Sequence, residues 1–204
     1  MGSALVTEFA NRNIEVTAVS RNPKEENNDK ITTAKADVLD VETLAEFLKG
    51  HDAVVSAYNA GWTNPNIYND FIAGAKAVQE AVKKSGVKRY IVIGGAGSLF
   101  VAPGLQAVDT PDFPAEIKPG ATAARDYLNI IKEEKDLDWA FFSPAFEMHQ
   151  GTKTGRTVKY RLGLENPVFN DDNRSILSVE DLAVVIADEV ENSKHHQVRF
   201  TAGY

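Results

Sequence analysis

The sequence predicts an α/β fold built on a doubly wound parallel sheet. Short runs rich in β-branched residues alternate with longer amphipathic stretches along most of the chain. Two runs, 53–58 (AVVSAY) and 90–95 (YIVIGG), are almost continuously apolar, which is typical of strands that helices cover on both faces. Strands joined through helices of this length make right-handed crossovers and so run parallel. The best-known arrangement of this kind is the Rossmann-type sheet, which binds ligands beyond the carboxyl ends of its strands.

Strands and helices are expected to follow one another regularly. Five runs fit strands of ordinary length, at 14–20, 31–36, 53–58, 90–94 and 139–143. The stretches between them have the length and apolar spacing of helices, at 3–11, 41–49, 68–84 and 121–135. In the last of these helices Ala124, Leu128 and Ile131 recur on one face.

The C-terminal segment, 145–204, is expected to form a small cap over the ligand edge of the sheet. Ser178 and Asp181 have the S-x-x-D spacing of a capping box, in which the hydroxyl and the carboxylate each bond a free backbone N–H. A helix at 179–191 and a last strand at 197–201 should follow. Because no repeat or linker divides the chain, residues 1–204 are interpreted as a single domain.

The composition narrows the classes of function. Among the 204 residues, 43% are hydrophobic and 25% are charged, as in soluble globular proteins. The absence of cysteine excludes disulfides, thiolate metal sites and thiol nucleophiles, and no metal site is expected. A net charge of -7 without a basic stripe disfavours a nucleic-acid partner. Apolar runs fall far short of the ~20 residues that cross a bilayer, so we expect a cytoplasmic protein with a small-molecule partner and no membrane contact.

The start of the chain departs from the expected pattern. A Rossmann-type domain begins with an apolar strand and a G-x-x-G-x-x-G turn, which lets backbone N–H groups approach a pyrophosphate. Here a helix comes at once, and only the last glycine, Gly2, stands before it. We expect Met1 to be an internal methionine of a longer protein, whose first strand would lie in the middle of the sheet. The alternative is an intact chain that begins with a helix.

Motifs along nearly the whole chain resemble a known family. They are GSAL at 2–5, VTAVSRNP at 16–23, ADV at 36–38, SAYN at 56–59, GWTNP at 61–65, GGAGS at 94–98, LDW at 137–139, FSP at 142–144 and RFTAGY at 199–204. Their order and spacing are similar to those of atypical short-chain dehydrogenases/reductases. Within them the resemblance is to the NAD(P)H-binding branch, described as flavin-reductase-like or NAD-dependent epimerase/dehydratase-like.

The resemblance implies a set of cofactor-binding residues at the carboxyl ends of the strands. They are Gly2, Ser20, Arg21, Asp37, Val38, Ala57, Tyr58, Asn59, Gly94 and Gly95. Arg21 stands where NAD-preferring members carry an acidic residue, and a guanidinium suits a 2′-phosphate, so NADP(H) is expected to be preferred over NAD(H). The alternatives are a solvated arginine at a strand end and, for Asp37, a cap on the next loop.

On the substrate side we expect contacts from Trp62, Ser143 and Pro144, with Ser98 and His149 as the catalytic candidates. Trp62 could stack on a planar substrate, or pack its loop against the next helix. Ser98 lies near the usual active-site serine of the superfamily, or else completes a glycine-rich turn. His149 could line the pocket or donate a proton.

The usual catalytic pair of the superfamily, Tyr-x-x-x-Lys, is absent. Tyr127 and Lys132 are five residues apart and project from different helix faces, so we expect Tyr127 to be half-buried support for the sheet. Register against the family places Ile117 and Ala121 at the positions of the pair. Ordinary alcohol dehydrogenation is therefore not expected.

Three functions fit these observations. The first is an oxidoreductase that passes a hydride from NADPH to a flat acceptor such as a flavin or a quinone, for which distance and orientation matter more than a protein acid. The second is a non-catalytic NAD(P)-binding redox sensor. The third is an NAD-dependent epimerase/dehydratase, which usually needs the missing tyrosine. The sequence leaves the oligomeric state open.

Overall fold

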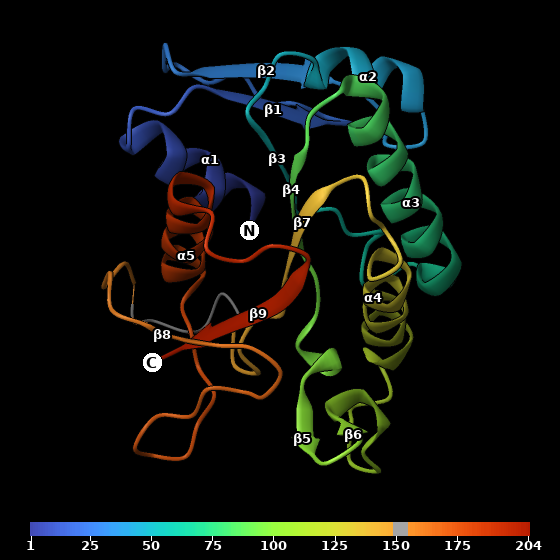
Figure 1. Ribbon diagram of the computed structural model, residues 1–204, viewed down its shortest axis with the longest axis vertical. Helices are drawn as coiled ribbons and strands as arrows, with labels where there is room; N and C mark the ends of the chain where they lie inside the picture. Colours follow the sequence, from blue (N-terminus) through green and yellow to red (C-terminus); the bar gives the residue numbers. More distant parts are fainter. Residues whose placement is uncertain (149–154) are drawn as a thin grey trace.

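The computed structural model describes residues 1–148 and 155–204, in which a mainly parallel sheet lies between two helical layers (Figure 1). Among these residues five α-helices occur: α1 (Gly2–Asn11), α2 (Val41–Leu48), α3 (Ile67–Ser85), α4 (Lys118–Ile131) and α5 (Val179–Asn192). Two short 3₁₀ turns follow strands, η1 (Ala96–Ser98) and η2 (Ala107–Asp109). The predicted α/β fold with alternating strands and helices is confirmed.

The main sheet has the strand order β3-β4-β7-β9-β8. Its first four strands pair parallel, and β8 pairs antiparallel with β9. Their bounds are β3 (Ala53–Ser56), β4 (Arg89–Ile93), β7 (Asp138–Phe142), β8 (Arg161–Gly163) and β9 (Val198–Gly203).

Helices cover both faces of this sheet because its strands are apolar on both sides. Helices α2, α3 and α4 enclose one core, in which Tyr90 and Phe141 face Leu128. Helices α1 and α5 enclose the other, around Phe142 and Phe200. Figure 1 shows the two helical layers on opposite sides of the strands.

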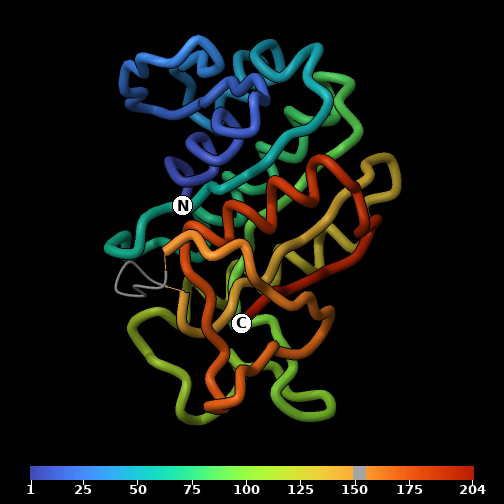
Figure 2. The backbone as a smooth tube through the Cα atoms, turned by 90° about the vertical axis from the view of Figure 1, so that its left-hand side faces the viewer, coloured from blue at the N-terminus to red at the C-terminus, as the bar shows by residue number. Residues whose placement is uncertain are grey.

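The parallel strands are divided between two sheets. Strands β1 (Val16–Ser20) and β2 (Ile31–Lys35) form a separate parallel pair, and no strand of the described residues pairs with both β1 and β3. One contact from the segment between α2 and β3 reaches β1: His51 Nε2 lies 2.9 Å from Thr17 Oγ1. The β1–β2 pair lies at one end of the molecule, and the hairpin of β5 (Phe100–Ala102) and β6 (Leu105–Gln106) lies at the other (Figures 1 and 2).

The C-terminal segment contributes to the layers themselves. It supplies α5 to a helical layer, and β9 and the edge strand β8 to the main sheet. A cap over the ligand edge of the sheet stays a prediction. Helix α5 begins after Ser178, as predicted, and the Ser178 hydroxyl accepts a hydrogen bond from the Asp181 N–H at 3.0 Å.

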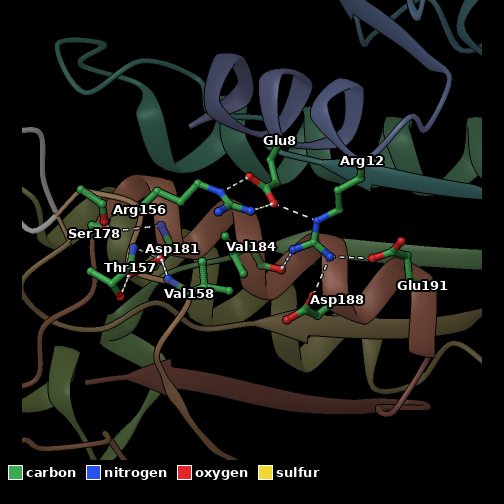
Figure 3. A network of polar contacts seen from close by, with 11 residues as sticks. Glu8, Arg12, Arg156, Thr157, Val158, Ser178, Asp181, Val184, Asp188 and Glu191 are labelled. Atoms are coloured by element: carbon green, nitrogen blue, oxygen red, sulfur yellow. Dashed lines mark hydrogen bonds and ion pairs between the residues drawn. The ribbon is translucent and has the colours of Figure 1, made fainter.

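The other half of the predicted capping box is wrong. The backbone N–H of Ser178 donates to the Tyr204 hydroxyl, at 3.1 Å. The buried Asp181 carboxylate instead accepts from the N–H groups of Thr157 and Val158, at 2.8 and 2.9 Å, and so fastens a distant loop to α5 (Figure 3). The N–H groups of Thr157 and Val158 thus satisfy the buried Asp181 carboxylate, which does not need the N–H of its neighbour Ser178.

The described helices, those of 1–148 and 155–204, include none with both the length and the apolar character that a bilayer crossing requires.

Candidate functional site

The carboxyl ends of β1, β2 and β3 bring three predicted cofactor residues together. Burial raises the pKa of the Tyr58 phenol above its usual range. The carboxylates of Asp70 and Asp37 raise this pKa further, whereas the charge of Arg21 lowers it. Arg21, Asp37 and Tyr58 come just after the ends of β1, β2 and β3, and the charges of Arg21 and Asp37 are both near enough to act on the Tyr58 phenol.

Arg21 is an exposed cation at this edge. It directly follows β1, next to the exposed Ser20, and none of the described residues forms an ion pair with it. An unpaired guanidinium presents its fork of donors to solvent, which suits a phosphate ligand.

Asp37 has a local partner. Its Oδ1 accepts a hydrogen bond from the Leu39 N–H at 3.0 Å, and its carbonyl accepts from the Asp40 N–H at 3.0 Å. The half-buried Val38 packs against the core under α2 and α3. The geometry therefore gives Asp37 the role of a loop cap, and contact of Asp37 and Val38 with a cofactor stays a prediction.

Tyr58 lies in a slot on α3 that a glycine creates. A Cβ at Gly74 would lie 2.3 Å from Tyr58 Cζ, closer than any real contact, so only glycine leaves room for the ring. The Tyr58 hydroxyl donates to the carbonyl of Asp70 at 3.0 Å, and its ring is 5.9 Å from that of Phe71. Its neighbour Ala57 packs on the opposite face of the sheet, toward α1 and α5. Alternation along the strand thus turns Tyr58 toward α3.

The loop 59–66 after β3 carries Trp62 at its tip. Asn59 Oδ1 accepts from the Gly61 N–H at 2.7 Å, so the predicted cofactor residue Asn59 shapes a turn. The Trp62 side chain remains 58% exposed. A Cβ at Gly120 would come within 2.8 Å of the Trp62 ring, which therefore packs on the first turns of α4. One side of the indole is packed and much of its surface remains open.

The start of α4 does not carry the Tyr–Lys pair of the superfamily. Ile117, which precedes the helix, is 41% exposed, and Ala121 is buried. Tyr127 is fully buried rather than half-buried, and its hydroxyl donates to Gln79 Oε1 at 3.1 Å. Burial raises the pKa of the Tyr127 phenol far above its usual range, so this tyrosine supports the core, as predicted, and does not transfer protons.

The glycine-rich turn after β4 is tightly packed. A Cβ at Gly94 would lie 2.0 Å from the Phe141 ring, and one at Gly95 would lie 3.2 Å from Ala124 Cβ. At Gly94 the missing side chain makes room for a core phenylalanine. Contact of either glycine with a cofactor stays a prediction.

The two serines near this turn form a buried pair. Ser98 Oγ lies 2.9 Å from Ser143 Oγ and donates to the carbonyl of Gly95, also at 2.9 Å. Both serines and the adjacent Pro144 are buried. In this conformation the Ser98 hydroxyl is satisfied inside the protein, so the geometry favours its role in the turn. A catalytic Ser98 and substrate contacts of Ser143 and Pro144 stay predictions.

Two further predicted residues complete the set. Gly2 is the first residue of α1, and no atom lies within 4 Å of the position of a Cβ there. His149 lies outside the described residues.

Sequence reasoning missed Asp70, Gly74 and Gly120, and also Asn64 and Asn66 of the Trp62 loop. A glycine inside an otherwise apolar helix, as at Gly74, was the available signal of a close approach. The partner in that approach cannot be read from local spacing, because Tyr58 is sixteen residues away along a different element.

Comparisons with known proteins agree with this geometry. A family model described as NAD(P)H-binding matches residues 1–193. A solved structure from Bacteroides thetaiotaomicron, named as a candidate epimerase, is 45% identical, with a TM-score of 0.90 over 99% of this chain and 91% of that chain. A structure from Streptococcus pneumoniae, named as a candidate NADH-flavin reductase, is 30% identical, with a TM-score of 0.84 over 99% of this chain and 93% of that chain.

A more distant structure bears on the fold alone. A Rossmann-fold NAD(P)-binding family protein from Shigella flexneri is 20% identical, with a TM-score of 0.67 over 98% of this chain and 86% of that chain. The predicted Rossmann-type fold is therefore confirmed. So is the predicted resemblance to atypical short-chain dehydrogenases/reductases, since the similar structures carry the epimerase and flavin-reductase names that this branch is known by.

Proposed function

The chain belongs to the NAD(P)H-binding family, and from this premise we propose that it is an oxidoreductase that reduces a planar acceptor, such as a flavin or a quinone, with NADPH. The observation that carries the proposal is the exposed Trp62 ring, held beside the start of α4, where Ile117 and Ala121 replace an acid–base pair. An open aromatic surface without the Tyr–Lys pair suits an acceptor that needs orientation more than acid catalysis.

The residues at the strand ends fit a dinucleotide. Arg21 offers a cation for a 2′-phosphate, which is why we propose NADPH over NADH. The first turn of α1 contains no acidic residue, so its free backbone N–H groups and helix dipole suit a diphosphate. The Tyr58 ring, fixed on Gly74, would form the wall next to the cofactor. When bound, the nicotinamide supplies a hydride.

Trp62 would bind and orient the acceptor. Stacking of a planar ring on an indole excludes water from one face and holds the two ring systems in register. Reduction of a flavin or a quinone takes up one hydride and one proton, and with Ile117 and Ala121 at the start of α4 the proton would come from solvent. The buried Ser98 and Ser143 would support the wall of the acceptor site.

The S. pneumoniae relative's name as a candidate NADH-flavin reductase favours this acceptor class. The B. thetaiotaomicron relative's name as a candidate epimerase favours a different reaction, so the acceptor must be tested directly.

The test is a turnover assay with the purified chain. NADPH is mixed with FMN, FAD or a soluble quinone, and the loss of NADPH absorbance is followed against a protein-free blank. We expect oxidation well above the blank with at least one acceptor. In Trp62→Ala the KM for that acceptor should rise ~10-fold, which corresponds to a lost stacking contact of ~1.4 kcal/mol, while the Kd for NADPH stays within twofold.

Trp62→Phe is the matched control, because it keeps an aromatic face and should retain most of the affinity for the acceptor. NADPH binding without oxidation of NADPH by any acceptor would refute the oxidoreductase and favour the sensor. An acceptor KM that does not change in Trp62→Ala would refute the role of Trp62.

A further inference from the structure

Asp70, in the first turn of α3, binds the loop that carries Trp62. Its Oδ2 accepts a hydrogen bond from Asn64 Nδ2 at 2.8 Å, and its Oδ1 accepts from Asn66 Nδ2 at 2.7 Å. Both bonds go to a carboxylate, and such charge-assisted bonds are the stronger kind. Asp70 thus holds two positions of the loop with one side chain.

Asn64 passes this restraint on to the rest of the loop. Its Nδ2 also donates to the Ala60 carbonyl at 3.3 Å, and its backbone N–H donates to the Gly61 carbonyl at 3.0 Å. Its Oδ1 accepts from the Asn66 N–H at 2.9 Å. The residues on both sides of Trp62 are therefore tied to one asparagine, which Asp70 orients.

The same residue contacts the cofactor side through its backbone. The Asp70 carbonyl accepts the Tyr58 hydroxyl at 3.0 Å. The Asp70 carboxylate binds the Trp62 loop, whereas the Asp70 carbonyl binds Tyr58. A substitution of the side chain therefore removes the first contact and leaves the second one in place.

We propose that Asp70 is a positioning residue for the acceptor: its carboxylate fixes the loop 59–66 and, through it, the orientation of the Trp62 ring. This inference rests on the proposed function for its effect on turnover, but not for its effect on the loop. A preorganised ring loses less entropy when a ligand stacks on it, so the restraint should appear as affinity for the acceptor.

The decisive variant is Asp70→Asn. The new amide has one oxygen and one NH₂ group. Its oxygen can accept from Asn64 or from Asn66, and the side-chain NH₂ group of the other asparagine then faces the new NH₂ group and loses its bond. The backbone carbonyl that binds Tyr58 is unchanged. Asp126→Asn is the matched control, because Asp126 is a carboxylate on α4 that binds Tyr68 and Arg125, and none of its hydrogen bonds or ion pairs within the described residues goes to loop 59–66.

The double variant Asp70→Asn/Asn66→Asp is the rescue. It exchanges donor and acceptor across one bond: the new amide NH₂ can donate to the new carboxylate at position 66, and the amide oxygen can accept from Asn64. Both bonds can form again, so a loss caused by these bonds should be restored.

The first readout is the mobility of Trp62 without any ligand. Trp139 is 2% exposed, so acrylamide hardly reaches it. Quenching by acrylamide therefore reports on Trp62, and the anisotropy decay of the quenchable emission reports on the motion of the Trp62 ring. We expect faster ring motion and stronger quenching in Asp70→Asn, with values near those of the unmodified protein in Asp126→Asn and in the double variant. Unchanged motion in Asp70→Asn overturns the inference.

The second readout is turnover. We expect Asp70→Asn to raise the acceptor KM ~3- to 10-fold, as loss of one hydrogen bond does, with the Kd for NADPH within twofold. A raised Kd for NADPH with an unchanged acceptor KM overturns the assignment to the acceptor side. Faster Trp62 motion with an unchanged acceptor KM supports the role of Asp70 in the loop and counts against Trp62 as the acceptor platform of the proposed function.

Discussion

Replacing Gly74 with alanine should destabilise the protein, although alanine is the better helix former. Gly74 lies in the interior of α3, and a Cβ there would lie 2.3, 2.4 and 2.5 Å from three atoms of the Tyr58 ring and hydroxyl. No small adjustment relieves three such contacts, so the Tyr58 ring must leave its slot. Helix propensity and packing therefore oppose each other at one position.

The magnitudes decide the sign. Alanine gains ~1 kcal/mol over glycine in a helix interior. Displacement of the ring loses its hydrogen bond to the Asp70 carbonyl, ~1 kcal/mol, and its contact with Phe71, ~0.5–1.5 kcal/mol, and forces a poorer rotamer at ~0.5–1.5 kcal/mol. Because Tyr58 is only half-buried and can swing toward solvent, we expect a net loss of ~1–2 kcal/mol.

A double-mutant cycle measured by urea unfolding tests this reasoning. In the background of Tyr58→Ala the slot is vacated, so Gly74→Ala should stabilise the protein by ~0.5–1 kcal/mol. The substitution therefore changes sign between the two backgrounds. The Kd for NADPH should also rise in Gly74→Ala, because Tyr58 forms a wall of the proposed cofactor site.

An equal stabilisation by Gly74→Ala in both backgrounds would show that the Tyr58 ring does not occupy the slot. The proposed position of the cofactor beside Tyr58 would then lose its support.

Three further predictions follow from single side chains. Arg21→Ala should lower the preference for NADPH over NADH at least ~10-fold, since a charge-assisted phosphate contact contributes ~1.5–3 kcal/mol; Kd values for both nucleotides measure it, and an unchanged ratio contradicts the role of Arg21. Burial raises the pKa of Glu134, but hydrogen bonds from the Asp136 N–H, Lys83 and Gln79 outweigh burial and lower this pKa from 4.5 to about 2. The ionised carboxylate therefore stabilises the fold by ~2–3 kcal/mol above pH ~4.5, and this contribution is lost as the pH falls toward 2. Glu134→Gln should thus be destabilising in urea at pH 7 and much less so at pH 2.5, and a difference that does not depend on pH would contradict the assignment. Glu8→Gln should destabilise the protein by ~1–3 kcal/mol, because the buried Glu8 carboxylate accepts from Arg12 and Arg156 between α1 and α5 (Figure 3); thermal unfolding within 1 °C of the unmodified protein would argue against it.

The order of the elements was readable from the sequence because hydrophobic periodicity is local. Each of the nine predicted strands and helices before residue 145 lies within a few residues of its place, as does α5 after Ser178. The short strands β5 and β6 were missed, because two or three residues are too few to show a period.

The sequence by itself determined the Rossmann-type alternation, the position of Arg21 at a strand end and the absence of the Tyr–Lys pair, since each depends on residues that are close along the chain. Only the tertiary structure decided which groups meet: that Tyr58 enters a slot at Gly74, that the Asp181 carboxylate binds the N–H groups of Thr157 and Val158 instead of the Ser178 N–H, and that Ser98 is buried against Ser143. These contacts join segments far apart in the sequence. A local pattern specifies which face of an element turns inward, whereas the partner of a side chain is set by how the layers pack, and that information is not contained in any single stretch of residues.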